Sequence, residues 1–245
     1  SSCQLGKLRA VVAVLPTKNS VEMSASASAK PQAAVNQRWH VLASRPEPNA
    51  SKIQELREEL KKESDLGLTY ERWAWYLDDD AVLDRFLVAR DDNVQKASRL
   101  IRDALAWRLK RRPHVLDYAE LDRECATGKL RVAPSLDRFG RPVVIFDNSV
   151  QNTKDAGGQL RALAFVLEHA LRRCDGSQVR KYVIFLHLND FSLRNNPSWS
   201  VTKETMKMLI CCFAECCGHI ILHNAPSVFS VAYRLVKPLI DPKTA

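Results

Sequence analysis

Apolar residues recur at helical spacing in the first half of the chain and gather into short continuous runs in the second half. In the first half, Ile53, Leu56 and Leu60 share one face while Glu and Lys occupy the other, which is typical of an amphipathic helix. Asn49 or Ser51 precedes this run and can cap the helix. The helices that this pattern predicts cover 53–64, a short segment at 69–76 that buries two tryptophans, 79–90 and 93–112.

In the second half, apolar runs with strand character alternate with helical stretches. The runs 130–135 and 142–147 flank a turn that contains Gly140, which predicts a hairpin. Further strands are expected at 181–190 and 219–225, and helices at 157–174, at 200–217 and after Pro226. This alternation predicts a mostly parallel sheet covered by helices. The expected fold is α/β, with an all-helical N-terminal lobe over 49–113 and a sheet-containing lobe over 125–245.

Residues 1–48 differ from the rest in composition, because they are rich in Ser, Ala, Lys and Pro. Six Lys or Arg and one acid, Glu22, lie within 1–46, so this segment holds five of the nine excess positive charges of the chain. Two interpretations stay open, an organellar targeting segment and a disordered leader. The apolar run 8–16 could form a short strand, which we expect to be isolated. Since the charge is concentrated here, it does not indicate a nucleic-acid-binding face elsewhere.

A second group of cations ends the helix expected at 93–112, just before Pro113. Cations at this end complement the helix dipole. The cluster is either a solvated helix end, which we expect, or a patch for lipid head groups. Its members are Arg108, Lys110, Arg111 and Arg112.

Other signals bound the chemistry. No run of 18 uncharged apolar residues occurs, so we expect no transmembrane helix. Seven cysteines without a visible secretory signal favour reduced thiols inside a cell. Four of the cysteines form a cluster that could share a metal with His219 or His223. We expect no metal site, because small hydrophobic thiols packed on a buried helix explain the cluster as well. These four are Cys211, Cys212, Cys216 and Cys217. We expect neither an enzyme nor a cofactor, because no GxSxG, HExxH or P-loop motif occurs.

The segment 223–244 combines a strand end, an amphipathic helix and a proline-containing turn. It closely resembles the C-terminal half of the CRAL-TRIO lipid-binding fold, whose members include phosphatidylinositol-transfer proteins, retinaldehyde carriers and tocopherol carriers. The matching motifs are Asn224-Ala225-Pro226, Phe229-Ser230, Lys237-Pro238 and Asp241-Pro242-Lys243-Thr244.

Two further segments resemble the same family and extend the likeness over about 79–245. Segment 81–108 is similar to the helices that precede the lipid-binding domain, and 137–144 is similar to the family's D-x-x-G-R-P hairpin. The resemblance implies that the sheet and its flanking helices enclose a lipid, and that a C-terminal helix acts as a mobile gate at the membrane. Family members continue past the Asp-Pro turn with another strand, so we expect the lobe 125–245 to be incomplete at its C-terminus.

The resemblance implies ligand-binding roles for Arg90, Ser192 and Thr244. In phosphatidylinositol-binding members, phosphate contacts come from a basic pair, from the threonine of the Asp-Pro turn and from a later lysine. Arg90 and Thr244 match, whereas Asp91 replaces the second basic residue and reverses its charge. The later lysine would lie beyond Ala245. Inositol-lipid binding is therefore one expectation among several for the ligand.

The function that the resemblance implies is binding and intermembrane transfer of a phospholipid, phosphatidylinositol-like, or of another hydrophobic ligand. We expect a monomer that contacts membrane surfaces transiently and binds no nucleic acid. Its expected place is the cytoplasm, peripheral to membranes, with organellar import left open by the basic leader. The alternative is a module with the same fold that docks a membrane or a protein without transporting a ligand.

Overall fold

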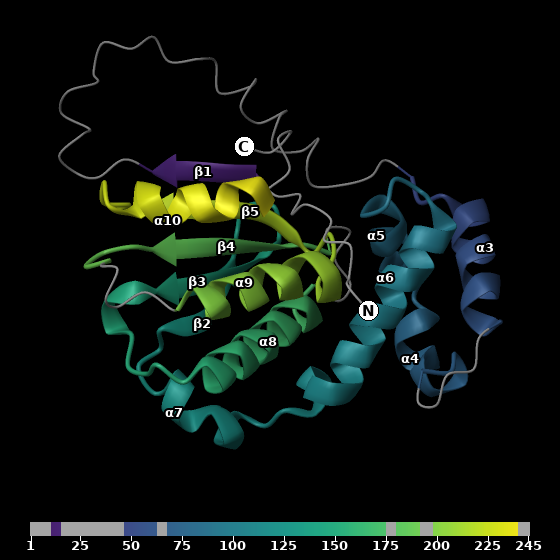
Figure 1. Cartoon of the computed structure of the whole chain (residues 1–245), viewed down its shortest axis with the longest axis horizontal. Coiled ribbons are helices and arrows are strands. Elements are labelled where there is room, and N and C mark those ends of the chain that lie inside the picture. Colours follow the sequence, from purple (N-terminus) through teal and green to yellow (C-terminus); the bar gives the residue numbers. More distant parts are fainter. Residues whose placement is uncertain (1–10, 16–46, 63–67, 175–179, 192–197, 240–245) are drawn as a thin grey trace, which may run out of the picture.

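The computed structural model describes residues 11–15, 47–62, 68–174, 180–191 and 198–239. They form a helical lobe and a lobe built on a five-stranded sheet, which lie beside each other in Figure 1. The expected α/β class, with the helical part preceding the main sheet, is confirmed. Among the described helices, none has the length and apolarity that a bilayer-spanning segment needs.

Three helices form the core of the helical lobe: α3 (Ala50–Lys61), α5 (Asp80–Val88) and α6 (Val94–Arg111). Their apolar faces meet, and Leu56, Leu83 and Ile101 are completely buried there. The Asn49 side chain accepts a hydrogen bond from the backbone N–H of Lys52 at 3.1 Å, which confirms one of the two expected caps.

The short helical segment between them consists of η1 (Glu71–Trp73) and α4 (Ala74–Leu77). Trp73 is buried, but Trp75 is 58% exposed, so the prediction that both tryptophans are buried was wrong for Trp75. The Trp75 ring lies outside the core, with its centre 5.9 Å from that of the Trp73 ring and 5.2 Å from that of the His114 ring, so it packs on the buried tryptophan and stays largely exposed.

The sheet has the strand order β1-β5-β4-β3-β2. Strands β3 (Pro142–Asp147), β4 (Tyr182–His187) and β5 (Cys217–His223) run parallel, with Val144 opposite Ile184 and Ile184 opposite Ile220. Strand β2 (Leu130–Leu136) pairs antiparallel with β3 and forms the expected hairpin. Asp137 closes this hairpin, since its carboxylate accepts hydrogen bonds from the backbone N–H groups of Phe139 and Arg141, each at 2.9 Å.

Strand β1 (Val11–Leu15) corrects the expectation of an isolated strand near the start of the chain. It pairs parallel with β5, with Val12 opposite Ile220, and forms one edge of the sheet. No local pattern reveals this pairing, because the partner strand lies more than two hundred residues later in the sequence.

Helices α8 (Ala156–Arg172) and α9 (Trp199–Lys207) cover one face of the sheet, and α10 (Phe229–Val236) follows β5 (Figure 1). The helix expected at 200–217 is shorter, because α9 passes into a π-helical turn, η5 (Met208–Cys212), and β5 begins at Cys217. The break is made by Glu215, whose φ is 57°. An apolar run without glycine or proline gives no sign of this left-handed residue.

Shorter elements connect these parts. From α6 the chain passes through η2 (Pro113–Val115), η3 (Tyr118–Leu121) and α7 (Asp122–Cys125) to β2. The turn η4 (Asn148–Val150) follows β3, and η6 (Lys237–Leu239) follows α10.

Arg108 joins the two lobes and corrects the expectation of a solvated helix end. Its side chain is only 2% exposed, and its Nη2 donates to Glu168 Oε1 of α8 at 2.5 Å. The guanidinium also lies 4.5 Å from the centre of the Tyr76 ring. Lys110, Arg111 and Arg112 are exposed as expected.

Candidate ligand-binding cavity

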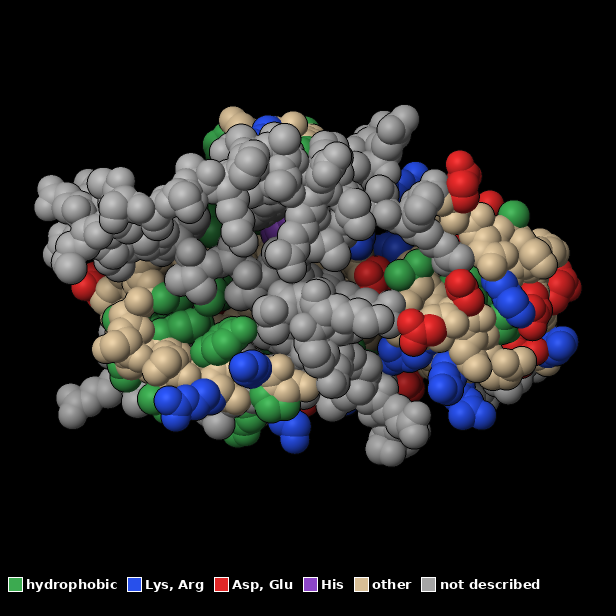
Figure 2. All heavy atoms as spheres, turned by 90° about the horizontal axis from the view of Figure 1, so that it is seen from above, with side chains coloured by type: hydrophobic (Ala, Val, Ile, Leu, Met, Phe, Trp, Pro, Cys, Tyr) green, Lys and Arg blue, Asp and Glu red, His purple; other side chains and the backbone are tan. Residues whose placement is uncertain are grey.

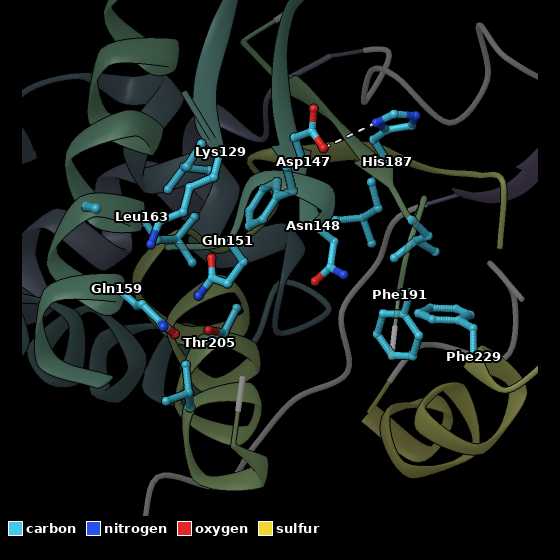
Figure 3. Close-up of a pocket in the computed structure, with 16 residues that line it drawn as sticks. Lys129, Asp147, Asn148, Gln151, Gln159, Leu163, His187, Phe191, Thr205 and Phe229 are labelled. Atoms are coloured by element: carbon cyan, nitrogen blue, oxygen red, sulfur yellow. Dashed lines mark hydrogen bonds and ion pairs between the residues drawn. The ribbon is translucent and has the colours of Figure 1, made fainter. Parts of the chain in front are cut away.

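A cavity opens between the carboxyl ends of β3 and β4, the helices α8 and α9, and the start of α10. Its empty volume is about 880 Å³, including its open mouth. Ligands of α/β sheets commonly bind at the carboxyl ends of the strands, so the position fits a binding site. Figure 3 shows side chains from these elements converging on one space.

Apolar side chains make up most of the wall. Those from the sheet and helices are Leu130, Phe146, Ala162, Leu163, Leu186 and Val201, and those near α10 are Leu188, Phe191 and Phe229. The Phe191 and Phe229 rings meet edge to face with their centroids 5.3 Å apart, as Figure 3 shows. This pair joins the segment after β4 to the first residue of α10, so it forms a contact at one side of the cavity.

A buried ion pair stands at the opposite side of the cavity. Lys129, which lines the wall, places its Nζ 2.5 Å from Glu124 Oε2 and 3.0 Å from Thr153 Oγ1. The Thr153 hydroxyl donates to the same Glu124 oxygen at 2.8 Å. All three residues are buried, so the lysine charge is neutralised inside the protein rather than by water.

Asp147 and His187 form a second polar contact, at the ends of β3 and β4. His187 Nδ1 lies 3.3 Å from Asp147 Oδ1, and the Ser149 hydroxyl donates to the same oxygen at 2.5 Å. Burial would raise the pKa of the Asp147 carboxyl, but the hydrogen bonds from Ser149 and His187 outweigh it, so this pKa lies below its usual range. Asp147 is therefore ionised near neutral pH.

Three amide side chains and the Thr205 hydroxyl complete the polar part of the wall. Gln151 Nε2 and Gln159 Nε2 both donate to the backbone carbonyl of Thr153, at 2.8 and 2.9 Å. Asn148 Nδ2 differs, because it is buried without a hydrogen-bond partner among the described residues. In the view of Figure 3 the Asn148 side chain is drawn between Gln151 and Phe191.

The residues expected from the resemblance do not gather in this cavity. Arg90 lies in the turn after α5, where its Nη1 donates to the Ala89 carbonyl at 2.8 Å, and it is not part of the wall. Ser192 and Thr244 lie outside the described residues. The polar wall residues Lys129, Asn148 and Gln159 were not predicted. The ends of two parallel strands were a usable signal for Asn148 and His187, since ligands favour that edge.

The four clustered cysteines are buried at the end of η5 and the start of β5. Within the described part of the chain, no group of three or more His, Cys, Asp or Glu could hold a metal ion. Burial raises the pKa of Cys217 to about 12, so its thiol is protonated. Cys216 Sγ accepts a short contact from Arg85 Nη1 of α5, which connects the thiol to the helical lobe.

Comparison with known proteins shows what the second lobe is similar to. A protein-family model described as CRAL/TRIO domain matches residues 127–245. A CRAL-TRIO domain-containing protein of Schizosaccharomyces pombe is 32% identical over 160 residues, which are 65% of this chain and 16% of that protein. The phosphatidylinositol transfer protein CSR1 of Eremothecium gossypii is 25% identical over 225 residues, which are 83% of this chain and 50% of that protein.

The fold comparison agrees with the sequence comparison. The crystal structure of Sfh5 matches with a TM-score of 0.57 and 16% identity, and the match covers 89% of this chain and 80% of that chain. This chain spans at most half the length of the two relatives named above. Over residues 127–245 the chain is therefore similar to CRAL-TRIO domains in sequence, and its fold is similar to that of Sfh5.

Proposed function

We propose that this chain binds one hydrophobic, lipid-like molecule in the cavity and carries it between membranes. The observation that carries the proposal is the cavity beside α10, nine of whose sixteen wall residues are apolar. A solid core would leave no room for a guest, whereas this wall offers apolar contact around an open space. The match to a phosphatidylinositol transfer protein supports transfer as the activity.

Burial of the ligand supplies the driving force. Each CH₂ group that leaves water contributes about 0.8 kcal/mol. A bilayer offers the same gain, so a carrier must present an equally dry wall. The apolar residues of β3, β4 and α8 provide it, and the proposed cycle needs no covalent step.

The contact between Phe191 and Phe229 is the proposed gate. Phe229 is the first residue of α10, and Phe191 is the wall residue that it touches. Movement of α10 away from the sheet would separate the rings and widen the mouth. Closure would restore an edge-to-face pair, which typically contributes about 0.5–1.5 kcal/mol beyond the area that it buries.

The surface around α10 suits contact with a membrane. Val231 of α10 is 50% exposed, and Arg234 and Lys237 close to it are exposed cations. An apolar side chain next to cations can insert into a bilayer surface while the cations meet anionic lipids. On the sheet side of the face seen in Figure 2, hydrophobic side chains lie next to Lys and Arg, whereas acidic residues gather over the helical lobe.

A transfer assay tests the proposal. The purified protein is first analysed by native mass spectrometry for a co-purifying lipid, and then mixed with donor vesicles that contain labelled lipids and with unlabelled acceptor vesicles. We expect a bound lipid of defined mass and faster transfer with protein than without it. Binding to vesicles with no exchange would favour the docking alternative, and absence of both binding and exchange would contradict the proposal.

A matched pair of variants links transfer to the cavity. Leu163→Trp places a large ring in the wall, whereas Arg161→Trp adds the same ring at an exposed position of α8. We expect the first variant to lose most of its transfer and the second to keep it, with both remaining folded by circular dichroism. Equal transfer by the two variants would show that the ligand does not occupy this cavity.

A further inference from the structure

A second hollow lies on another side of α8, where this helix meets α9 and the end of α6. Its empty volume is about 350 Å³, including its mouth. Ala162 and Leu163 of α8 line the larger cavity, whereas Leu160 and Arg161 line this hollow. The two spaces therefore occupy different faces of α8, and a molecule in the second hollow would leave the larger cavity and α10 free.

The floor of the second hollow is apolar. Trp107 of α6 packs edge to face on the Phe213 ring, with the ring centroids 6.0 Å apart, and this contact fixes the position of its indole. A volume at the lower end of the range for ligand sites, about 300–1,000 Å³, suits a single large side chain better than a whole lipid. The apolar residues that line the hollow are Trp107, Leu116, Leu160, Ala164 and Met208.

Two arginines that line the hollow have no partner within the protein. Arg111 of α6 and Arg161 of α8 are exposed, and neither guanidinium makes an ion pair or a hydrogen bond with the part of the chain that the structure describes. Asp117 and Glu120, the acids that follow Arg111 in the sequence, form the capping box of η3 instead. The two arginines are therefore free to meet anions from outside.

The surroundings of the hollow are basic as a whole. Glu204 of α9 is the third charged residue that lines it, so the lining carries one more cation than anions. Lys110 and Arg112 flank Arg111, and Lys207 lies three residues after Glu204 on the same side of α9. All three of these cations are exposed. Such an excess attracts an acidic partner and repels a basic one.

We propose that this hollow docks an acidic segment of another protein, which inserts one large apolar side chain between α6, α8 and α9. Carboxylates beside that side chain would pair with Arg111 and Arg161. An apolar pocket that receives one anchoring side chain, with arginines beside it, is typical of the residues that dominate binding at protein interfaces. A flat bilayer surface fits less well, because the apolar floor lies inside a hollow.

The inference adds a protein partner to the proposed carrier and does not depend on lipid binding. The hollow takes no part in the proposed transfer, since α10 and the mouth of the larger cavity lie elsewhere. A partner seated there could hold the chain near a particular membrane while α10 stays accessible.

Fluorescence anisotropy with three labelled peptides tests the inference on the full chain. The first peptide contains Glu-Asp-Phe-Asp-Glu between Gly-Ser flanks, the second has Ser in place of Phe, and the third has Lys in place of each acid. We expect the first to bind at least about tenfold more tightly than the second, because only the first can bury an aromatic ring. The third should not bind. Equal binding of the first two, preference for the third, or no binding of any peptide would overturn the inference.

Charge reversal locates the binding site. Arg111→Glu/Arg161→Glu should weaken binding of the first peptide at least about tenfold, since both carboxylate partners are lost. The control Arg99→Glu/Arg123→Glu changes the net charge equally at exposed positions outside the hollow and should weaken it less than about twofold. Circular dichroism verifies that both variants are folded. Equal losses in the two variants would overturn the inference.

Vesicles of phosphatidylserine separate a protein partner from a lipid surface. They should bind the two double variants alike, because the proposed membrane contact lies at α10. Loss of vesicle binding in Arg111→Glu/Arg161→Glu alone would assign this surface to anionic lipids and overturn the inference.

Discussion

At the scale of single residues, Lys129 lines the cavity and forms an ion pair with Glu124 in which both residues are buried. Glu124→Ala would leave the Lys129 ammonium without its anion inside the protein. We expect a loss of about 3–5 kcal/mol in the free energy of unfolding, measured by urea denaturation. The double variant Glu124→Leu/Lys129→Met removes both charges and should stay within about 1–2 kcal/mol of the natural chain. If the single variant were no less stable than the double one, the pair would not be buried as described.

His219 makes the stability of the chain dependent on pH. It is completely buried, and its Nδ1 lies 2.6 Å from Arg141 Nη1. Burial, together with the positive charge of Arg141, lowers the pKa of His219 from 6.5 to about 4. Between these values the unfolded chain binds a proton that the folded chain does not, so the free energy of unfolding falls as the pH drops through this window.

His219→Gln removes the titrating group and leaves a neutral polar side chain. The free energy of unfolding of the variant should fall less than that of the natural chain between pH 7 and pH 4.5. Most of the pH range between the unfolded and folded pKa values of His219, 6.5 and about 4, lies within this interval. Urea denaturation at both pH values measures the difference. His114, whose pKa is also lowered, is present in both proteins and cancels in the comparison. Equal losses would rule out His219 as a source of the pH dependence.

At the scale of elements, the start of α8 is set by close contacts around a glycine. A Cβ at Gly158 would lie 2.7 Å from Asp155 Oδ2 and 2.8 Å from Glu124 Oε1. Asp155 caps the helix through the backbone N–H of Gly157, and Glu124 is held by Lys129, so neither carboxylate can move freely. Gly158→Ala should therefore destabilise the chain, although alanine is the better helix former by about 1 kcal/mol.

The neighbouring glycine provides the control for this prediction. At Gly157 a Cβ would be 3.5 Å from Asp155 Oδ1, an ordinary contact. Gly157→Ala should keep or raise the urea midpoint, whereas Gly158→Ala should lower it. Two equal shifts in the same direction would mean that helix propensity alone decides the outcome at this end of α8.

The elements were largely predictable because their signals are local. The stripe Ile53, Leu56 and Leu60 and the cap at Asn49 are visible over one or two helical turns, and the hairpin before β3 has its turn residues in place. Predictions were wrong where contacts that no local sequence pattern reveals determine the structure. Glu215 adopts a positive φ between η5 and β5, and the Trp75 ring packs on Trp73 and His114 while it stays largely exposed.

The candidate site was less accessible to sequence reasoning than the fold. From the sequence alone, Lys129 would be expected on the surface. Only the structure shows that Glu124 and Thr153 lie beside its ammonium group. Asn148 follows a predicted strand, and only the structure shows that its Nδ2 is buried without a hydrogen-bond partner among the described residues. The motifs that resemble the CRAL-TRIO family are mostly residues that shape the backbone. They are local in the sequence, whereas the chemistry of the cavity depends on side chains that meet across the sheet and α8.

At the scale of the whole molecule, the Arg108–Glu168 pair connects the two lobes. Arg108 lies 2.5 Å from Glu168 and faces the Tyr76 and Phe213 rings. Glu168→Ala would leave the guanidinium buried without its anion, and we expect a loss of about 3–5 kcal/mol. Differential scanning calorimetry should show a lower melting temperature.

The double variant Arg108→Met/Glu168→Leu is the control for the lobe contact. It removes the charges, keeps apolar bulk between the lobes and should recover much of the stability that Glu168→Ala loses. If the double variant were as unstable as the single one, the ring contacts of Arg108 would matter more than its charge pair.

The position of β1 has a consequence for how the protein is made. Its pairing partner β5 is synthesised about two hundred residues later, since Val11 faces His219. At about 5–20 residues per second, a ribosome needs roughly 10–40 s to cover that interval. During this time the nascent Val11–Leu15 segment has no hydrogen-bonding neighbour, and an uncovered apolar strand is prone to association with other chains. Chaperones that shield emerging polypeptides should therefore influence the yield of this protein more than they influence a domain whose edge strand is translated last.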